Sequence, residues 1–195
     1  MMSQSLGRAI ALLSAAAALA LEGCVPVVVG AAVGGTAMVA TDRRTTGTQV
    51  DDEFIEDKVS YNINERFKGD FHVNVTSYNG IVLLTGEVPA EAARADVAAV
   101  VLATPKVRAV QNELAIGLVT DLGSRSNDSL ITSKVKTRFV EANKFQINHV
   151  KVVTERGVVY LLGLVRHGEG DAAAEIASTT AGVQRVVKVF EYLAG

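Results

Sequence analysis

Cysteine, proline and tryptophan are scarce in this chain. Its 195 residues include one cysteine, three prolines and no tryptophan. A single cysteine excludes an internal disulfide and any metal site built from several thiolates. The three histidines, His72, His149 and His167, stand in no metal-ligand spacing with each other, the cysteine or a carboxylate. We therefore predict no metal site and no cofactor, and we assign these histidines to strands or to the surface.

An excess of charge of one sign is also absent. The chain has 19 Lys and Arg against 21 Asp and Glu, a formal net charge of -2. No global basic field would attract nucleic acid. The chain contains no Gly-x-Ser-x-Gly nucleophile elbow. Gly30, Gly34 and Gly35 precede no strand–helix unit of the kind that binds phosphate. We predict that the protein is not an enzyme and has no small-molecule substrate.

The segment before the cysteine is typical of a secretory signal. Residues 1–8 carry one basic residue and no acid, and the 13 residues 9–21 are almost entirely apolar. That run is too short to cross a bilayer core comfortably, and it matches the apolar region of a signal peptide. We expect residues 1–23 to be a signal peptide. The alternative is an uncleaved N-terminal anchor with an incidental cysteine.

The run Leu21-Glu22-Gly23-Cys24 resembles a bacterial lipobox. The resemblance implies that the thiol of Cys24 receives a diacylglycerol, that the signal is cut before it, and that the new amino group is acylated. Glu22 departs from the small residue usual at that place. Val25, in place of an aspartate, implies sorting to the outer membrane. Several acyl chains bind a membrane far more firmly than one chain does.

We expect residues 24–50 to be a tether and linker. Residues 25–40 are apolar but interrupted by one proline and three glycines, which are poor helix material. They form either a small-residue spacer or a segment that lies against lipid. Residues 41–50 are polar and typical of a linker.

The rest of the chain contains two copies of one pattern, at 51–116 and 128–195, joined by a linker at 117–127. Lys58-Val59 matches Lys134-Val135 at an offset of 76 residues, and Gly80, Gly86 and Val88 match Gly157, Gly163 and Val165 at 77. A period this long with two copies indicates two small domains in tandem, not a solenoid.

Each copy predicts the order α-β-β-α-β. In the first copy, apolar residues every fourth position from Ile55 to Phe67 indicate a helix. Asp51–Glu53 suit its N-terminus, and Asn79-Gly80 is a hairpin signal. In the first copy we expect strands at 71–75, 81–88 and 107–116 and a second helix at 90–103. In the second copy we expect strands at 150–154, 158–165 and 183–193 and a second helix at 168–180. A helix between the last two strands is a crossover, so each three-stranded sheet should be mixed. We predict an α+β fold of two two-layer sandwiches, each with two helices on one face of the sheet.

The tandem units resemble BON domains. The resemblance rests on Asn-Gly-x-Val-x-Leu-x-Gly-x-Val at 79–88, on its copy at 156–165, and on the turns 105–110 and 181–186 before the last strands. With the lipobox, the whole chain resembles the dual BON-domain outer-membrane lipoproteins. That resemblance implies a non-catalytic, phospholipid-binding protein that maintains the envelope from the periplasmic face of the outer membrane.

The two copies differ in charge. Residues 51–116 hold 11 acidic and 6 basic residues, whereas residues 128–195 hold 7 acidic and 9 basic residues. Basic residues gain energy near anionic lipid. We expect Asn127-Asp128 to cap the first helix of copy two. In this helix Leu130 is apolar but lies off the stripe of residues that faces the core. The predicted lipid-contact residues are Leu130, Ile131, Lys134, Lys136 and Arg138. The alternative is that Leu130 packs between the domains and the cations form an ordinary solvated face.

Two functions follow from these patterns. The first is a lipid-anchored protein whose second domain contacts anionic phospholipid, as the resemblance also implies for the second BON domain. The second is a protein-interaction adaptor, for example for the outer-membrane protein assembly machinery, which docks through the acidic first domain.

Overall fold

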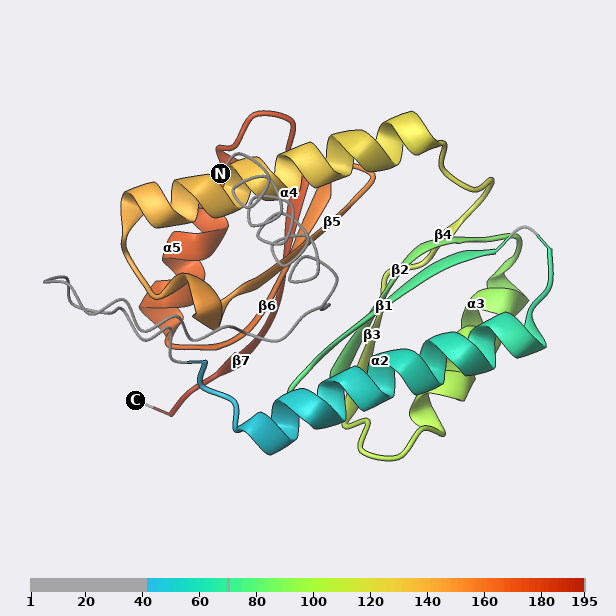
Figure 1. The fold of residues 1–195 in the computed structure, drawn as a ribbon. Helices are drawn as coiled ribbons and strands as arrows, with labels where there is room; N and C mark the ends of the chain where they lie inside the picture. Colours follow the sequence, from blue (N-terminus) through green and yellow to red (C-terminus); the bar gives the residue numbers. More distant parts are fainter. Residues whose placement is uncertain (1–41, 70, 195) are drawn as a thin grey trace, which may run out of the picture. The chain divides into compact units, whose positions relative to one another are not determined.

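The computed structural model describes residues 42–69 and 71–194 (Figure 1). The expected signal peptide 1–23, the lipidated Cys24 and the segment 25–40 lie outside the described residues. Within the described part, no helix is long and apolar enough to cross a membrane.

Two α/β units follow one another in the described chain. The first contains α2 (Thr46–Arg66), β1 (His72–Tyr78), β2 (Ile81–Val88), α3 (Glu91–Leu102), β3 (Ala109–Asn112) and β4 (Ala115–Ile116). The second contains α4 (Leu122–Ala142), a 3-10 turn η1 (Ile147–His149), β5 (Lys151–Glu155), β6 (Val158–Val165), α5 (His167–Ser178) and β7 (Arg185–Tyr192). The predicted α+β fold and its tandem repeat are confirmed.

Both sheets are mixed, as the crossover helices predict. In the first unit β1 pairs antiparallel with β2, and β2 pairs in parallel with β3 and β4. The second unit repeats the order β5-β6-β7 with the same directions. The hairpin turns need residues with positive φ: Asn79 and Gly80 have φ of 52° and 74°, and Arg156 and Gly157 have 50° and 73°. These values are typical of the turn that joins two strands by two residues.

The helices of each unit cover one face of its sheet (Figure 1). The apolar stripe of α2, formed by Ile55, Val59 and Ile63, packs with α3 and with the inward residues of β2. In the second unit the stripe Ile131, Val135 and Phe139 does the same against α5 and β6. These stripes recur every four residues, so one side of each helix is removed from water and supplies the main hydrophobic stabilisation.

Two predicted helix starts and one predicted strand differ from the structure. Helix α2 begins at Thr46 after the N-cap Thr45, and α4 begins at Leu122 after the N-cap Asp121. Polar segments assigned to linkers therefore continue the helices by about a turn or more, because Thr and Asp side chains cap them. The third strand of the first unit is interrupted between β3 and β4, where Leu114 turns into the core with 2% exposure.

The residues expected to start the helices have another role. Asp52 and Asp128 lie within α2 and α4 and are buried. Asp52 accepts hydrogen bonds from the backbone N–H of Asn79 and Gly80 at 2.7 and 2.8 Å. Asp128 accepts from Arg156 and Gly157, both at 2.8 Å. Each carboxylate thus binds the first helix of its unit to the hairpin turn of the same unit.

The sheet faces opposite the helices meet each other. Side chains alternate along a strand, so Leu83 of β2 and Tyr160 and Leu162 of β6 point away from the helices. With Tyr78 they form one cluster in which every member is at most 3% exposed. Burial raises the pKa of Tyr160 to about 12. The two units therefore share a second apolar core between their sheets.

Residues 42–44, just after the undescribed segment, are bound to both units. Arg43 donates to both carboxylate oxygens of Glu169 at 2.6 and 2.8 Å, and to the carbonyl of Leu164. Arg44 donates to Asp52 at 2.9 Å and lies 3.9 Å over the ring of Tyr78. The chain therefore enters the folded part at a place where it is held by charge-assisted hydrogen bonds.

We expect Asp128→Ala to lower the free energy of unfolding by about 1–3 kcal/mol, because two turn amides lose their acceptor. Asp96→Ala, at an exposed position of α3, is the matched control and should change it by less than about 0.5 kcal/mol. Urea unfolding of the two variants measures both values. Equal effects would show that the turn amides find other partners.

The Arg43–Glu169 pair should make stability depend on acid. The hydrogen bonds from Arg43 hold the pKa of Glu169 at about 2, below its ordinary 4.5. A depressed pKa contributes stability that is present above pH 4.5 and is lost as the pH falls from 4.5 through 2. Glu169→Gln keeps an acceptor for the Arg166 N–H at the start of α5. It should flatten the fall in unfolding free energy across this range, whereas Glu175→Gln on the same helix should not. An unchanged slope in Glu169→Gln would contradict this assignment.

Candidate functional site

The solvent face of α4 carries large apolar side chains. Leu122, Leu130 and Val140 are exposed by 79, 60 and 61%. Leu122 and Val140 are about five helical turns apart on the same side, and Leu130 lies between them. The residues around them on this face are small hydroxyls: Ser126, Ser129, Ser133 and Thr137. Leu130 is therefore exposed and does not pack between the domains, whereas its contact with lipid stays a prediction.

Two lysines border this face. Lys134 and Lys136 are both exposed, and about 100° per residue places them about 160° apart, one on each side of the apolar residues. Neither forms an ion pair with a residue that the structure describes. The helix therefore presents apolar groups in the centre of this face and a lysine at each edge. The long stem of a lysine can extend its charged group away from the helix axis.

Two of the five predicted contact residues have other positions. Ile131 is 1% exposed and belongs to the core of its unit, so its assignment to the contact surface is wrong. It lies on the stripe that packs against the sheet. Arg138 is half-buried, and its guanidinium donates to the carbonyl of Ile176 at 2.8 Å and to the hydroxyls of Thr179 and Thr180. It binds the last turn of α5, where a cation is favourable at the helix dipole.

A groove lies beside this face. It has a volume of about 410 Å³ and runs between α4 and the end of α5, and its lining includes Leu130, Lys134, Arg138, Thr180 and Ala181. Its position was not evident from the sequence, because the end of α5 reaches α4 only in the folded unit. The only sequence signal for this groove is the repeat itself, because residues at the equivalent positions of the first unit line a similar groove.

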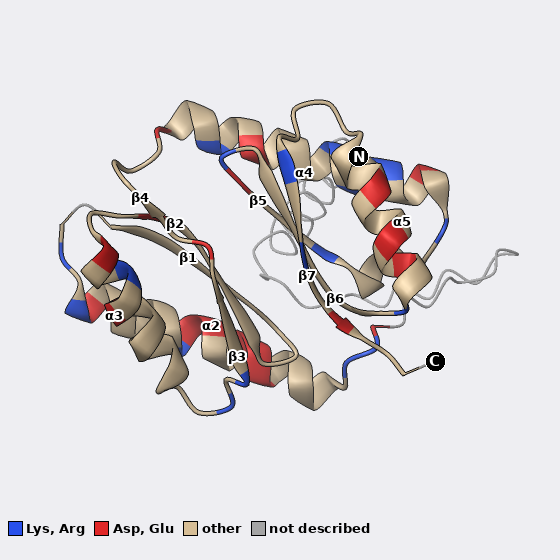
Figure 2. Cartoon of the chain, turned by 180° about the vertical axis from the view of Figure 1, so that it is seen from behind, with Lys and Arg blue, Asp and Glu red and all other residues tan. Residues whose placement is uncertain are grey.

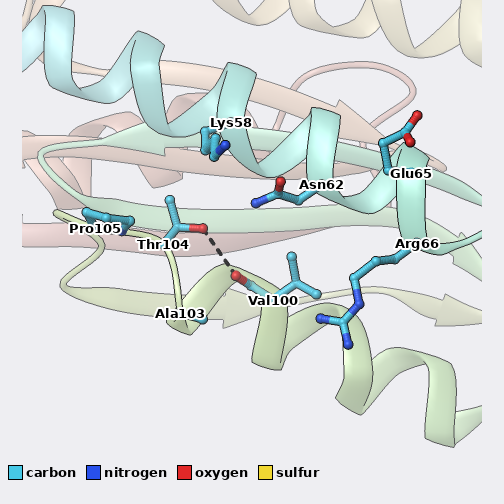
Figure 3. Close-up of a pocket in the computed structure, with 8 residues that line it drawn as sticks. All are labelled: Lys58, Asn62, Glu65, Arg66, Val100, Ala103, Thr104 and Pro105. Atoms are coloured by element: carbon cyan, nitrogen blue, oxygen red, sulfur yellow. Dashed lines mark hydrogen bonds between the residues drawn. The ribbon is translucent and has the colours of Figure 1, made fainter.

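That equivalent groove, of about 350 Å³, lies between α2 and the end of α3 (Figure 3). Five of its lining residues match those of the second groove at an offset of 76: Lys58, Asn62, Glu65, Thr104 and Pro105 against Lys134, Arg138, Glu141, Thr180 and Ala181. The hydroxyl of Thr104 donates to the carbonyl of Val100 at 3.1 Å, so it closes the last turn of α3 at the edge of the groove.

Charge separates the two units. Figure 2 shows acidic positions along α2 and several basic positions on α4. Some of these opposite charges form ion pairs between the two units. Lys151 pairs with Glu56 at 2.8 Å, and Arg185 with Glu113 at 3.5 Å. Lys134 and Lys136 of α4 form no such ion pair with a described residue, so their charges remain exposed on the outer face of the helix.

Two of the three histidines occupy equivalent positions in the two units, which the sequence did not indicate. His72 and His149 occupy equivalent positions, since their carbonyls approach Gly86 and Gly163 so closely that a Cβ there would meet them at 2.0 and 2.2 Å. Both glycines are therefore positions where the backbone of a neighbouring strand or turn packs too closely for a side chain. His72 lies 2.9 Å from Glu87, and His149 lies 3.8 Å from Glu169. His167 stacks on Tyr192 at the surface.

Comparison with known proteins agrees with this architecture. The BON domain family model matches residues 51–117 and 127–194. The chain is 41% identical over 181 residues to the outer membrane lipoprotein DolP of Haemophilus influenzae, which covers 91% of this chain and 92% of that protein. It is 37% identical over 154 residues to a 21 kDa hemolysin of Actinobacillus pleuropneumoniae, covering 78% and 79% of the two chains.

Among solved structures, CdsD of Chlamydia trachomatis, a structural protein of the Type III secretion system, is 18% identical with a TM-score of 0.30. The match covers 74% of this chain and 64% of that one. Such a score is too low to indicate a shared arrangement. The family match and the 41% identity to DolP over 91% of the chain decide the assignment: the chain belongs to the non-enzymatic outer-membrane lipoproteins that carry two BON domains.

Proposed function

We propose that this lipoprotein is anchored through Cys24 at the periplasmic face of the outer membrane, binds anionic phospholipid there through α4 of its second BON domain, and maintains membrane integrity. The observation that carries the proposal is the exposed face of α4, with Leu122, Leu130 and Val140 in the centre and Lys134 and Lys136 at its edges. Cys24 lies outside the described residues, so its lipidation rests on the lipobox pattern.

This face has both properties that interfacial binding needs. Apolar side chains gain roughly 25 cal/mol for each Å² that they remove from water, and the cost of leaving leucines exposed to water disappears once they enter the lipid boundary. Each lysine near an anionic surface contributes about 1 kcal/mol. Three leucine-sized or smaller groups and two lysines give modest binding. A tether raises the local concentration of membrane, so modest binding is sufficient for a largely occupied state.

Sedimentation with vesicles tests the proposal. The fragment 39–195 contains both BON domains as one compact part of the chain and lacks the anchor. It should sediment with vesicles that contain anionic phospholipid and remain in solution with purely zwitterionic vesicles. Leu130→Glu with Lys134→Glu should abolish sedimentation, because the pair removes insertion and attraction together. Added salt should weaken the wild-type interaction.

Leu102→Glu with Lys68→Glu is the matched control. Both positions are exposed in the first BON domain, and the pair changes the net charge by the same amount. This variant should sediment as the wild type does. Equal loss in both double variants would assign the binding to net charge, and unchanged sedimentation of the α4 variant would remove α4 from the proposal.

A second candidate function has one observation in its favour. The solvent face of α2 exposes Val50, Phe54 and Tyr61 by 58, 48 and 62%. Phe54 is equivalent to Leu130, but its helix belongs to the acidic domain, which anionic lipid repels. Exposed aromatic residues are typical of protein–protein hot spots. We infer from this face the alternative role of an adaptor, with the outer-membrane protein assembly machinery as an expected partner.

Crosslinking separates the two roles. A photoreactive residue in place of Phe54 should give protein crosslinks in intact cells if the adaptor role holds, and the same residue in place of Leu130 should give mainly lipid adducts. Protein crosslinks at Leu130 and none at Phe54 would contradict both assignments. Mass spectrometry of the adducts distinguishes lipid from protein.

A further inference from the structure

A histidine and two glutamates from both BON domains lie together beside the shared core. His72 of β1 is the direct cross-strand partner of Glu87 of β2, so their side chains project from the same face of the sheet. The ring Nδ1 of His72 lies 2.9 Å from Oε2 of Glu87. Glu155, the last residue of β5, comes from the other domain. One ligand atom from each of the three side chains lies within 4.8 Å of the other two.

Both carboxylates are removed from water. Glu87 is 0% exposed and Glu155 is 7% exposed. In the part of the chain that the structure describes, no Lys or Arg nitrogen lies within 4 Å of either carboxylate. Glu155 accepts one hydrogen bond, from the amide of Asn74 at 2.8 Å. Two buried carboxylates beside one imidazole leave negative charge that hydrogen bonds to neutral groups compensate only in part.

The surroundings are open enough for an ion and its water. A hollow of about 280 Å³ adjoins the cluster, and its lining includes His72, Asn74, Glu155 and Arg125. Arg125 is the nearest cationic side chain in this hollow, but its Nε makes no hydrogen bond. Its guanidinium is not within ion-pair distance of Glu155, so it does not neutralise the pair directly.

We propose that His72, Glu87 and Glu155 form a binding site for a divalent transition-metal ion, for which Zn²⁺ is the appropriate probe. One imidazole nitrogen and two carboxylate oxygens are a donor set that zinc accepts, with water in the remaining position. Binding requires the proton between His72 and Glu87 to leave to solvent and the three side chains to close on the ion. The sequence predicted no such site, because the three residues are separated by 15 and 68 positions.

Neighbouring groups would orient these ligands. Glu87 accepts hydrogen bonds from the hydroxyl and the backbone N–H of Thr120. Asn74 donates to Glu155 and faces Nε2 of His72 at 3.3 Å. Such outer contacts hold ligands in place in metal sites. Because Glu155 and Glu87 belong to different BON domains, the ion would join the two domains.

Zinc binding by the full chain, extracted in detergent with its anchor, tests the site. Equilibrium dialysis should show one saturable Zn²⁺ per chain. His72→Gln and Glu155→Gln should each weaken binding by at least about tenfold, and Asn74→Ala by about 10–100-fold as an outer contact. His167→Gln removes a surface histidine and should have no effect. The absence of saturable binding, or equal weakening in His167→Gln, would overturn the proposal.

Two further readouts keep the result interpretable. X-ray absorption should show only nitrogen and oxygen around the zinc, whereas a sulfur neighbour would place the ion elsewhere in the chain and overturn the site. Zinc should raise the thermal unfolding midpoint of the wild type and of His167→Gln but not of Glu155→Gln. An equal rise in all three would also overturn it. Asn74→Ala, at an exposed position, provides a weakened variant should a ligand substitution prevent folding.

Discussion

Each BON domain depends on one buried carboxylate in its first helix. Asp52 and Asp128 accept both amides of the hairpin turn in their own unit, so helix and sheet have one relative position. A buried carboxylate is costly unless its oxygens are hydrogen-bonded, and the turn supplies those bonds only when Asn79-Gly80 or Arg156-Gly157 adopts positive φ. For Asp52 these bonds, with those from Ser77 and Arg44, outweigh burial and lower its pKa. Turn chemistry and helix packing thus specify each other.

Once each unit is formed, its outer sheet face must be covered. Leu83 and Tyr160 cannot remain in water at low cost, and the two faces cover each other. Ion pairs between the domains, such as Lys151–Glu56, are partly exposed and individually contribute little, but their opposite signs fix which positions meet. With both sheets covered, the outer faces of α2 and α4 remain for other partners. One is acidic with aromatic residues, and the other is cationic with aliphatic ones.

Much of the fold followed from periodicity, and the site only in part. Spacing every fourth residue identified the stripe of Ile131, Val135 and Phe139, and the offset of 100° identified Leu130 as exposed. The same rule should have excluded Ile131 from the surface. The sequence does not reveal the contacts of Arg138, because its partners, a carbonyl in the last turn of α5 and two hydroxyls just after that helix, are about 40 residues away. The helix starts were placed too late, because Asp52 and Asp128 resemble N-caps by type but bind the hairpins instead.

The sequence by itself determined the order of elements, the duplication, the turns and the family, because these depend on local patterns of apolar residues, glycine and asparagine. It also determined that α4 would carry Leu130 and cations on one helix. Only the tertiary structure decided which of those side chains remain free, where residues 42–44 are held, and that His72, Glu87 and Glu155 come together. The reason is that these contacts join residues far apart in the chain, and their distances are set by how the two sheets pack against each other.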